Sequence, residues 1–264
     1  MHPMQWNEAD LRFIIETAVT RRQDHAQIVE LVRDKPDLVA PLLDDPRLAD
    51  RLLREREAVA RISPRLLFTI LLRRLRRDLE QHEVVYEREG GYRLPVFAGS
   101  QARALLDEPG MVDYLIDLLC SFVRTHSGTV YWKERGFWRK RKFSDLNLDD
   151  MVALCHLVAP EWRPRLYKRI GDIALFLSGV FPDHLTQLWK GARHRVQEPR
   201  TVSDYEREGR YFYRLAARQA EPPWSAALFH RLAEQFTLAR EILTTLSYRY
   251  LKPLREQYFV APGT

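Results

Sequence analysis

The segment from Thr129 to Phe143 holds the densest set of side chains that could do chemistry. It reads TVYWKERGFWRKRKF, so aromatic residues are interleaved with basic ones. Lysine and arginine neutralise phosphates, and aromatic rings stack on nucleic-acid bases. The candidate binding residues of this basic-aromatic patch are Trp132, Lys133, Arg135, Trp138, Arg139, Lys140, Arg141 and Lys142.

The same segment also has a purely structural interpretation. Gly136 stands between aromatic and β-branched runs, a pattern that predicts a β-hairpin. Successive strand residues point to opposite faces, so only half of the run from Arg139 to Lys142 could meet one ligand. Basic residues on an edge strand also hinder aggregation. A solvated edge and a nucleic-acid site both remain open, and the patch is the best functional signal in the chain.

A second group of residues could form a small-ligand pocket. Asp172 interrupts an otherwise apolar helical run, and a carboxylate at the edge of a core must be paired or hydrogen-bonded. The favoured interpretation is an internal ion pair or hydrogen bond that fixes helix register. The alternative is a catalytic or ligand-binding carboxylate near His184, Tyr205 and Tyr213.

Close helix packing is expected around Gly209. Tyr205, Gly209 and Tyr213 recur at intervals of four residues and therefore share one helix face. A mid-helix glycine costs about 1 kcal/mol relative to alanine, which suggests that a neighbouring element approaches closely there. The helix that contains Gly171 is the expected neighbour.

The signatures of the common enzyme classes are missing from the sequence. It has no glycine-rich phosphate loop, no G-x-S-x-G elbow, no H-E-x-x-H and no paired C-x-x-C. A zinc site built from Cys120, His126, Cys155 and His156 is disfavoured, because adjacent helical residues point about 100° apart. We therefore expect no metal and no other cofactor, and the sequence leans against an enzyme.

Composition indicates an ordinary globular protein. Of 264 residues, 45% are hydrophobic, and 42 basic residues against 36 acidic ones leave a net charge of +6. The two cysteines lie in apolar helical runs, which favours buried thiols in a reducing compartment. The N-terminus lacks an export signal, and apolar runs such as 173–180 are far shorter than the roughly 20 residues of a membrane span. A cytoplasmic protein without a membrane partner is predicted.

The spacing of apolar residues predicts a mainly α fold, a multi-helix bundle with two small β-hairpins inserted in the first half. Asp45-Pro46 and Ser63-Pro64 are helix starts, Ser203 with Glu206 is a capping-box pattern, and Pro222-Pro223 opens a long final helix. The hairpins are expected at 82–96, around Gly90-Gly91, and at 129–143. We expect them to pair with each other or to lie against the helical stretch between them.

The predicted domains are a helical lobe with both hairpins, residues 1–144, and a helical bundle lobe, residues 145–264, or else one continuous domain.

Four segments resemble a widespread family of uncharacterised bacterial proteins. They are SPRLLFTILLRRLRRDLE, FSDLNLDDMVALCHL, YKRIGDIALFLSGVFPDH and DYEREGRYFYRLA, and the resemblance covers most of the chain. That family has no assigned activity, so the resemblance implies no role for any residue.

The expected function is that of a non-catalytic cytoplasmic binding or scaffold protein. Its basic-aromatic surface would engage an acidic partner, either nucleic acid or protein. The alternative is an enzyme or small-ligand-binding protein with a pocket around Asp172, His184 and Tyr205. A third possibility is a subunit of a larger assembly that docks through the final helix, and the sequence indicates no oligomeric state.

Overall fold

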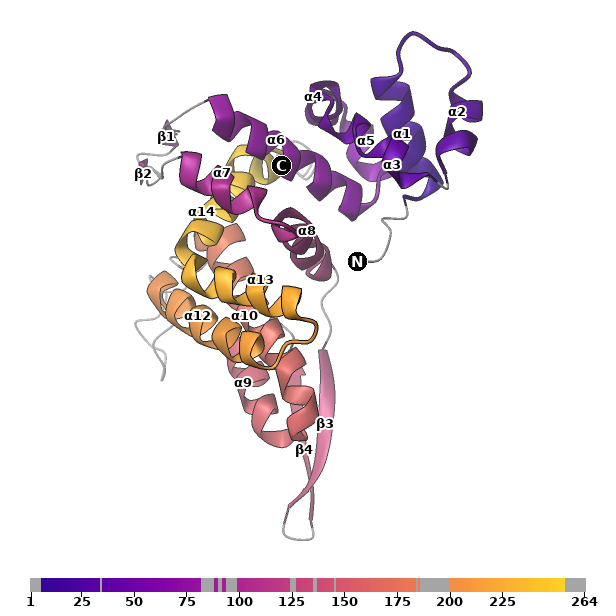
Figure 1. The fold of residues 1–264 in the computed structure, drawn as a ribbon. Coiled ribbons are helices and arrows are strands. Elements are labelled where there is room, and N and C mark those ends of the chain that lie inside the picture. The colour runs from indigo at the N-terminus through magenta and orange to yellow at the C-terminus, as the bar shows by residue number, and fades with distance from the viewer. Residues whose placement is uncertain are drawn as a thin grey trace, which may run out of the picture. The chain divides into compact units, whose positions relative to one another are not determined.

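The protein is mainly helical, as predicted, in the computed structural model of the chain (Figure 1). The structure describes residues 6–33, 35–81, 88–89, 92–93, 99–123, 127–134, 137–144, 146–183, 185 and 200–254. None of the helices in these ranges has the length and hydropathy needed to cross a membrane.

The chain forms two compact units. The first comprises Met1–Cys120 together with Tyr248–Thr264, and the second comprises Ser121–Ser247. This division falls at Ser121 and Tyr248 and differs from the predicted boundary after residue 144. The second predicted hairpin therefore belongs with the later helices, and the end of the chain belongs with the earlier ones.

The first unit is built from short helices that begin at the expected signals. Asp45 accepts a hydrogen bond from the backbone N–H of Arg47 at 2.9 Å, and Pro46 occupies the first helical position. The elements are α1 (Glu8–Ala18), α2 (His25–Val32), α3 (Pro36–Val39), η1 (Leu42–Asp44), α4 (Pro46–Arg54), α5 (Arg56–Arg61), α6 (Pro64–Gln81), α7 (Gly99–Asp107), α8 (Met111–Ser121) and η3 (Ser247–Leu251).

Two buried carboxylates join distant parts of the first unit. Asp10 in α1, 2% exposed, accepts a hydrogen bond from the backbone N–H of Ser63 at 2.7 Å, just before α6. Asp78 in α6 accepts the hydroxyl of Tyr250 and lies 3.0 Å from Arg74 Nε. Burial, followed by this hydrogen bond, raises the pKa of Tyr250. The second contact attaches the last helical turns to α6, 172 residues earlier in the chain.

The strands form two separate antiparallel ribbons. β1 (Arg88–Glu89) pairs with β2 (Tyr92–Arg93), and β3 (Ser127–Glu134) pairs with β4 (Phe137–Ser144). The expectation that the two hairpins pair with each other is wrong, because each ladder has only two strands. Most of the first predicted hairpin lies outside the described residues. Neither ribbon is extended into a larger sheet within the described ranges.

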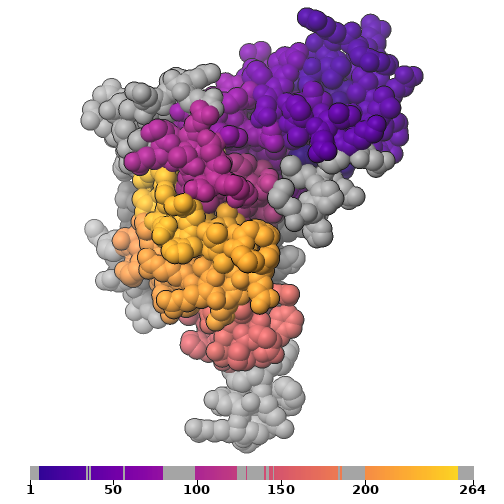
Figure 2. All heavy atoms as spheres, viewed as in Figure 1, coloured from indigo at the N-terminus to yellow at the C-terminus, as the bar shows by residue number. Residues whose placement is uncertain are grey.

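The helices of the second unit are α9 (Leu148–Leu157), η2 (Pro160–Trp162), α10 (Arg163–Val180), α12 (Val202–Arg218), α13 (Pro223–Glu234) and α14 (Phe236–Leu246). Helix α10 is central, since α9, α12 and α14 all pack against it. Helices α12 and α13 also pack against each other (orange in Figure 2).

Three details of this unit differ from the sequence predictions. The predicted final helix is broken at Gln235, so that α13 packs on α12 while α14 packs on α10. The apolar stripe of α14 is buried, with Ile242, Leu243 and Leu246 at 0% exposure, and is therefore not an open docking face. The capping box of α12 uses Thr201 and Asp204 in place of Ser203 and Glu206.

Gly171 and Gly209 permit the close packing of α10, α12 and α14. A Cβ atom on Gly171 would lie 2.8 Å from the ring of Tyr213 in α12. On Gly209 it would overlap the ring of Phe236 in α14 and lie 3.1 Å from Ala174 Cβ in α10. The close approach expected at Gly209 is confirmed, and both α10 and α14 supply it.

Gly209→Ala is expected to destabilise the protein by about 1–3 kcal/mol, because Phe236 is fully buried and has no space to yield. This loss outweighs the roughly 1 kcal/mol that alanine adds to helix propensity. The free energy of unfolding in urea measures the change. The control is Arg214→Ala, at an exposed position of the same helix, which should stay within about 0.5 kcal/mol of the parent. An equal or more stable Gly209→Ala protein would contradict the packing described.

Candidate functional site

The basic-aromatic patch lies on the β3–β4 ribbon. The register places Trp132 opposite Arg139, Lys133 opposite Trp138 and Lys142 opposite Thr129. Lys140, opposite Tyr131, has an exposed side chain. Arg135 lies outside the described residues. All the other members of the patch are thus on one two-stranded element.

The ribbon segment carries most of the net charge of the chain. Residues 127–144 contain six of the 42 basic residues and one of the 36 acidic ones. The remaining sequence contains 36 basic and 35 acidic residues, so it is nearly neutral. Residues 61–77 are just as basic in sequence, with six basic residues and no acidic one. In the structure, Arg61, Arg65, Arg73, Arg74 and Arg76 of that run lie beside acidic side chains.

The ladder register separates the patch into two faces. Paired positions share a face, and the face changes with each step along a strand. Thr129 and Lys140, both exposed, mark one face. We call it the lysine face, and its register positions are Thr129, Tyr131, Lys133, Trp138, Lys140 and Lys142. The other face, the arginine face, has the positions Val130, Trp132, Glu134, Phe137, Arg139 and Arg141.

The end of β4 is anchored to α9. The backbone N–H of Ser144 donates to Asp150 Oδ2 at 3.2 Å, and Ser144 Oγ accepts the N–H of Leu146 at 3.3 Å. Asn147 caps the helix by accepting the N–H of Asp150, also at 3.2 Å. Figure 1 shows the ribbon running beside α9 and continuing past it. A two-stranded ribbon is marginal alone, so this attachment supports it.

The chain just before β3 is anchored to α10. Phe122 stacks on Phe176 of α10 with ring centroids 4.1 Å apart. The guanidinium of Arg169 lies 3.9 Å from the centroid of the Phe122 ring, and it also donates to Ser121 Oγ at 2.8 Å. The two ends of the ribbon segment are thus held by neighbouring helices, since α9 packs on α10.

Arg200 joins α9 to α12 and was not identified from the sequence. Its Nη1 and Nη2 donate to the two carboxylate oxygens of Asp149 at 2.7 and 2.5 Å, and its Nε lies 3.2 Å from Glu208. These hydrogen bonds raise the pKa of Arg200. The only local signal was its position directly before the cap residue Thr201. The clamp fixes the helix that carries the ribbon.

The alternative pocket is only partly assembled from the residues predicted for it. Asp172, 2% exposed, accepts the hydroxyl of Tyr213 at 2.9 Å and the ammonium of Lys168 at 2.6 Å. These contacts are the internal pairing that a buried carboxylate requires. His184 lies outside the described residues. The role of this group in catalysis or ligand binding stays a prediction.

Tyr205 belongs to a different environment from Asp172. It is buried, and the charged groups that act on it are Arg200, Glu208 and Asp149. Its burial raises the pKa of the phenol. The structure therefore joins Asp172 with Tyr213 and associates Tyr205 with the Arg200 clamp.

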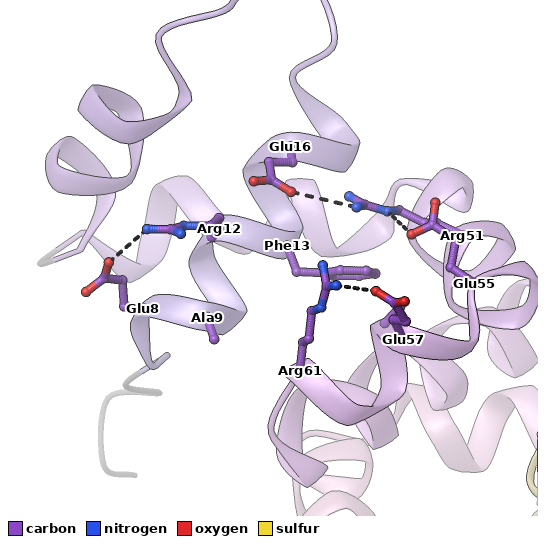
Figure 3. A pocket seen from close by; sticks show the side chains of 10 residues that line it. Glu8, Ala9, Arg12, Phe13, Glu16, Arg51, Glu55, Glu57 and Arg61 are labelled. Atoms are coloured by element: carbon purple, nitrogen blue, oxygen red, sulfur yellow. Dashed lines mark hydrogen bonds and ion pairs between the residues drawn. The ribbon is translucent and has the colours of Figure 1, made fainter. Parts of the chain in front are cut away.

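A hollow of about 930 Å³ lies in the first unit between α1, α4 and α5 (Figure 3). Phe13 lies within it, with the guanidinium of Arg51 5.0 Å from the ring centroid. The basic side chains around the hollow are paired with neighbouring acids: Arg12 with Glu8, Arg51 with Glu16 and Glu55, and Arg61 with Glu57. Four acidic and three basic side chains leave the lining of the hollow with a net charge of −1, so charge gives it no strong preference for a ligand.

The thiols and metal-binding residues give no further site. Cys120 and Cys155 are free, and burial raises the pKa of each. No group of three or more His, Cys, Asp or Glu side chains capable of holding a metal ion occurs among the residues that the structure describes.

Comparisons of the chain with protein-family models, with curated proteins and with solved structures find no match.

Tyr213→Phe should lower the free energy of unfolding by about 1–3 kcal/mol. The substitution preserves the ring but removes a donor from a buried carboxylate. Tyr211→Phe, on the same helix at 55% exposure, is the matched control and should be nearly neutral. Urea unfolding of the two variants provides the comparison. Equal stability of both would show that the Asp172 contact contributes nothing.

The capping box of α12 should make stability depend on pH. Hydrogen bonds from Thr201, then from Arg207, lower the pKa of Asp204 to about 2. A carboxyl whose pKa is lowered on folding stabilises the protein above its unfolded value of about 3.9, and this contribution is lost as the pH falls toward 2. The stability difference between the parent and Asp204→Ala should therefore shrink over that interval in urea unfolding. Glu161→Ala, which removes an exposed carboxylate, is the control. A difference independent of pH would contradict the assignment.

Proposed function

We propose that this chain is a non-catalytic binding protein whose β3–β4 ribbon engages an acidic partner. The observation that carries the proposal is the charge of the ribbon segment, six basic residues and one acidic residue in 127–144. The rest of the chain sums to near neutrality, and its most basic run, 61–77, lies beside acidic side chains. Long-range attraction to an acidic surface would therefore be directed at this element. The two free cysteines fit a reducing compartment, so we propose a cytoplasmic location.

The surroundings of the ribbon support a binding role. Its ends are attached to helices through Phe122 and Ser144, while Lys140 and Thr129 between them are exposed. A charged element supported in this way can meet a partner without unfolding the helical unit beneath it. Protection of an exposed strand edge would also use lysines, but it requires no affinity for anions. Affinity for anions is therefore the property that distinguishes a binding role from protection of a strand edge.

Retention on immobilised heparin tests the proposal. Lys140→Glu combined with Lys142→Glu should elute at clearly lower salt than the parent, because two charges of the ribbon are reversed. The matched control combines Arg21→Glu with Arg214→Glu, which makes the same change in net charge at exposed positions outside the ribbon segment. The control should elute close to the parent, and circular dichroism should show equal helix content.

If both double variants elute at equally lowered salt concentrations, retention on heparin follows net charge alone. That result, or failure of the parent to be retained at low salt, would refute a binding role for the ribbon.

A further inference from the structure

We infer that the acidic partner is a single-stranded nucleic acid bound across the lysine face of the β3–β4 ribbon. The inference rests on the proposed function and names the ligand of the same site. It depends on the ladder register, which determines which basic and aromatic positions belong to one face.

The lysine face has the charge that a phosphate backbone requires. Lys133, Lys140 and Lys142 occupy it, and no acidic residue does. The arginine face carries Arg139 and Arg141 but also Glu134, so its net charge is lower. Lys140 and Thr129, two positions of this face, are exposed. Lysine ammonium groups neutralise phosphates as point charges and tolerate a varied backbone path.

The aromatic positions on this face favour unstacked bases. Tyr131 is opposite Lys140, and Trp138 is opposite Lys133, so each aromatic position has a lysine as its direct cross-strand neighbour. Directly paired positions lie roughly 5 Å apart at Cβ. Register positions suited to phosphate contact and to base stacking therefore alternate over a short distance, as proteins that bind single strands require.

Neither a duplex nor an acidic protein uses both features of the face. The bases of a duplex are already stacked on one another, and sequence-specific recognition of RNA targets single strands whose bases can stack on aromatic side chains. An acidic protein surface would pair with the lysines but offers few flat rings to stack on the tyrosine and tryptophan. The combination of three lysines with two aromatic positions on one face favours a single strand.

Fluorescence anisotropy with labelled oligothymidine of about 20 nucleotides, and with a duplex of the same length, tests the inference at several salt concentrations. The single strand should bind more tightly than the duplex. Lys140→Ala should reduce the slope of log K against log salt by about 1. Trp138→Ala should weaken single-strand binding by about fivefold to a hundredfold while leaving the salt slope unchanged.

Two further variants separate stacking from loss of structure. Trp224→Ala removes a tryptophan that is 62% exposed at the start of α13, and it should leave binding unchanged. Trp138→Phe keeps a ring at this position and should retain most of the affinity. Urea unfolding of Trp138→Ala should match that of the parent, which would show that affinity is lost without loss of structure.

The outcomes distinguish this inference from the proposed function. Suppose that the parent and its variants behave on heparin as proposed. If duplex then binds as tightly as single strand, or if Trp138→Ala does not change single-strand binding, the single-strand inference is wrong. The proposed binding of an acidic partner would stand. Binding to polyglutamate without binding to oligothymidine would likewise overturn it in favour of an acidic protein. If the ribbon variants fail to show the expected loss of heparin retention, both the proposed function and the single-strand inference are wrong.

Discussion

The need to pair a buried carboxylate determines how the second unit is packed. Asp172 in α10 is removed from water, and it is paired with Tyr213 of α12 and Lys168 of its own helix. The contact requires α10 and α12 to come close, which Gly171 permits because a side chain there would meet the Tyr213 ring. The pairing of Asp172 with Tyr213 and the close packing of α10 on α12 thus depend on each other.

The ribbon is connected to this packed centre through two helices. Arg200 joins α12 to α9 through Asp149 and Glu208, and α9 receives the end of β4 through Asp150. Phe122, before β3, stacks directly on α10. These contacts use both charge-assisted hydrogen bonds and aromatic stacking, so the ribbon has support that an isolated hairpin lacks in water.

The most basic helical segment has acidic neighbours, whereas the ribbon segment has an excess of basic residues. In the first unit, Asp78 pairs with Arg74 and Tyr250, and the basic side chains around the hollow near Phe13 have acidic partners. The sequence outside 127–144 is close to neutral, whereas the ribbon segment has five more basic than acidic residues. An acidic partner would therefore be attracted mainly to the ribbon, which is the basis of the proposed function.

The amino-acid sequence by itself determined the helical class, the Asp45-Pro46 helix start and the close approach at Gly209. The helical class and the helix start arise from periodicity and from contacts within about four residues along the chain. The close approach was indicated by the cost of a glycine in mid-helix. Only the tertiary structure decided the Arg200 clamp, the attachment of Tyr250 to Asp78, the break at Gln235 and the division of the lysine and arginine faces. Each of these depends on strand register or on contacts between residues far apart in the sequence. Local sequence allows many such pairings, and the packing of the whole unit selects one of them.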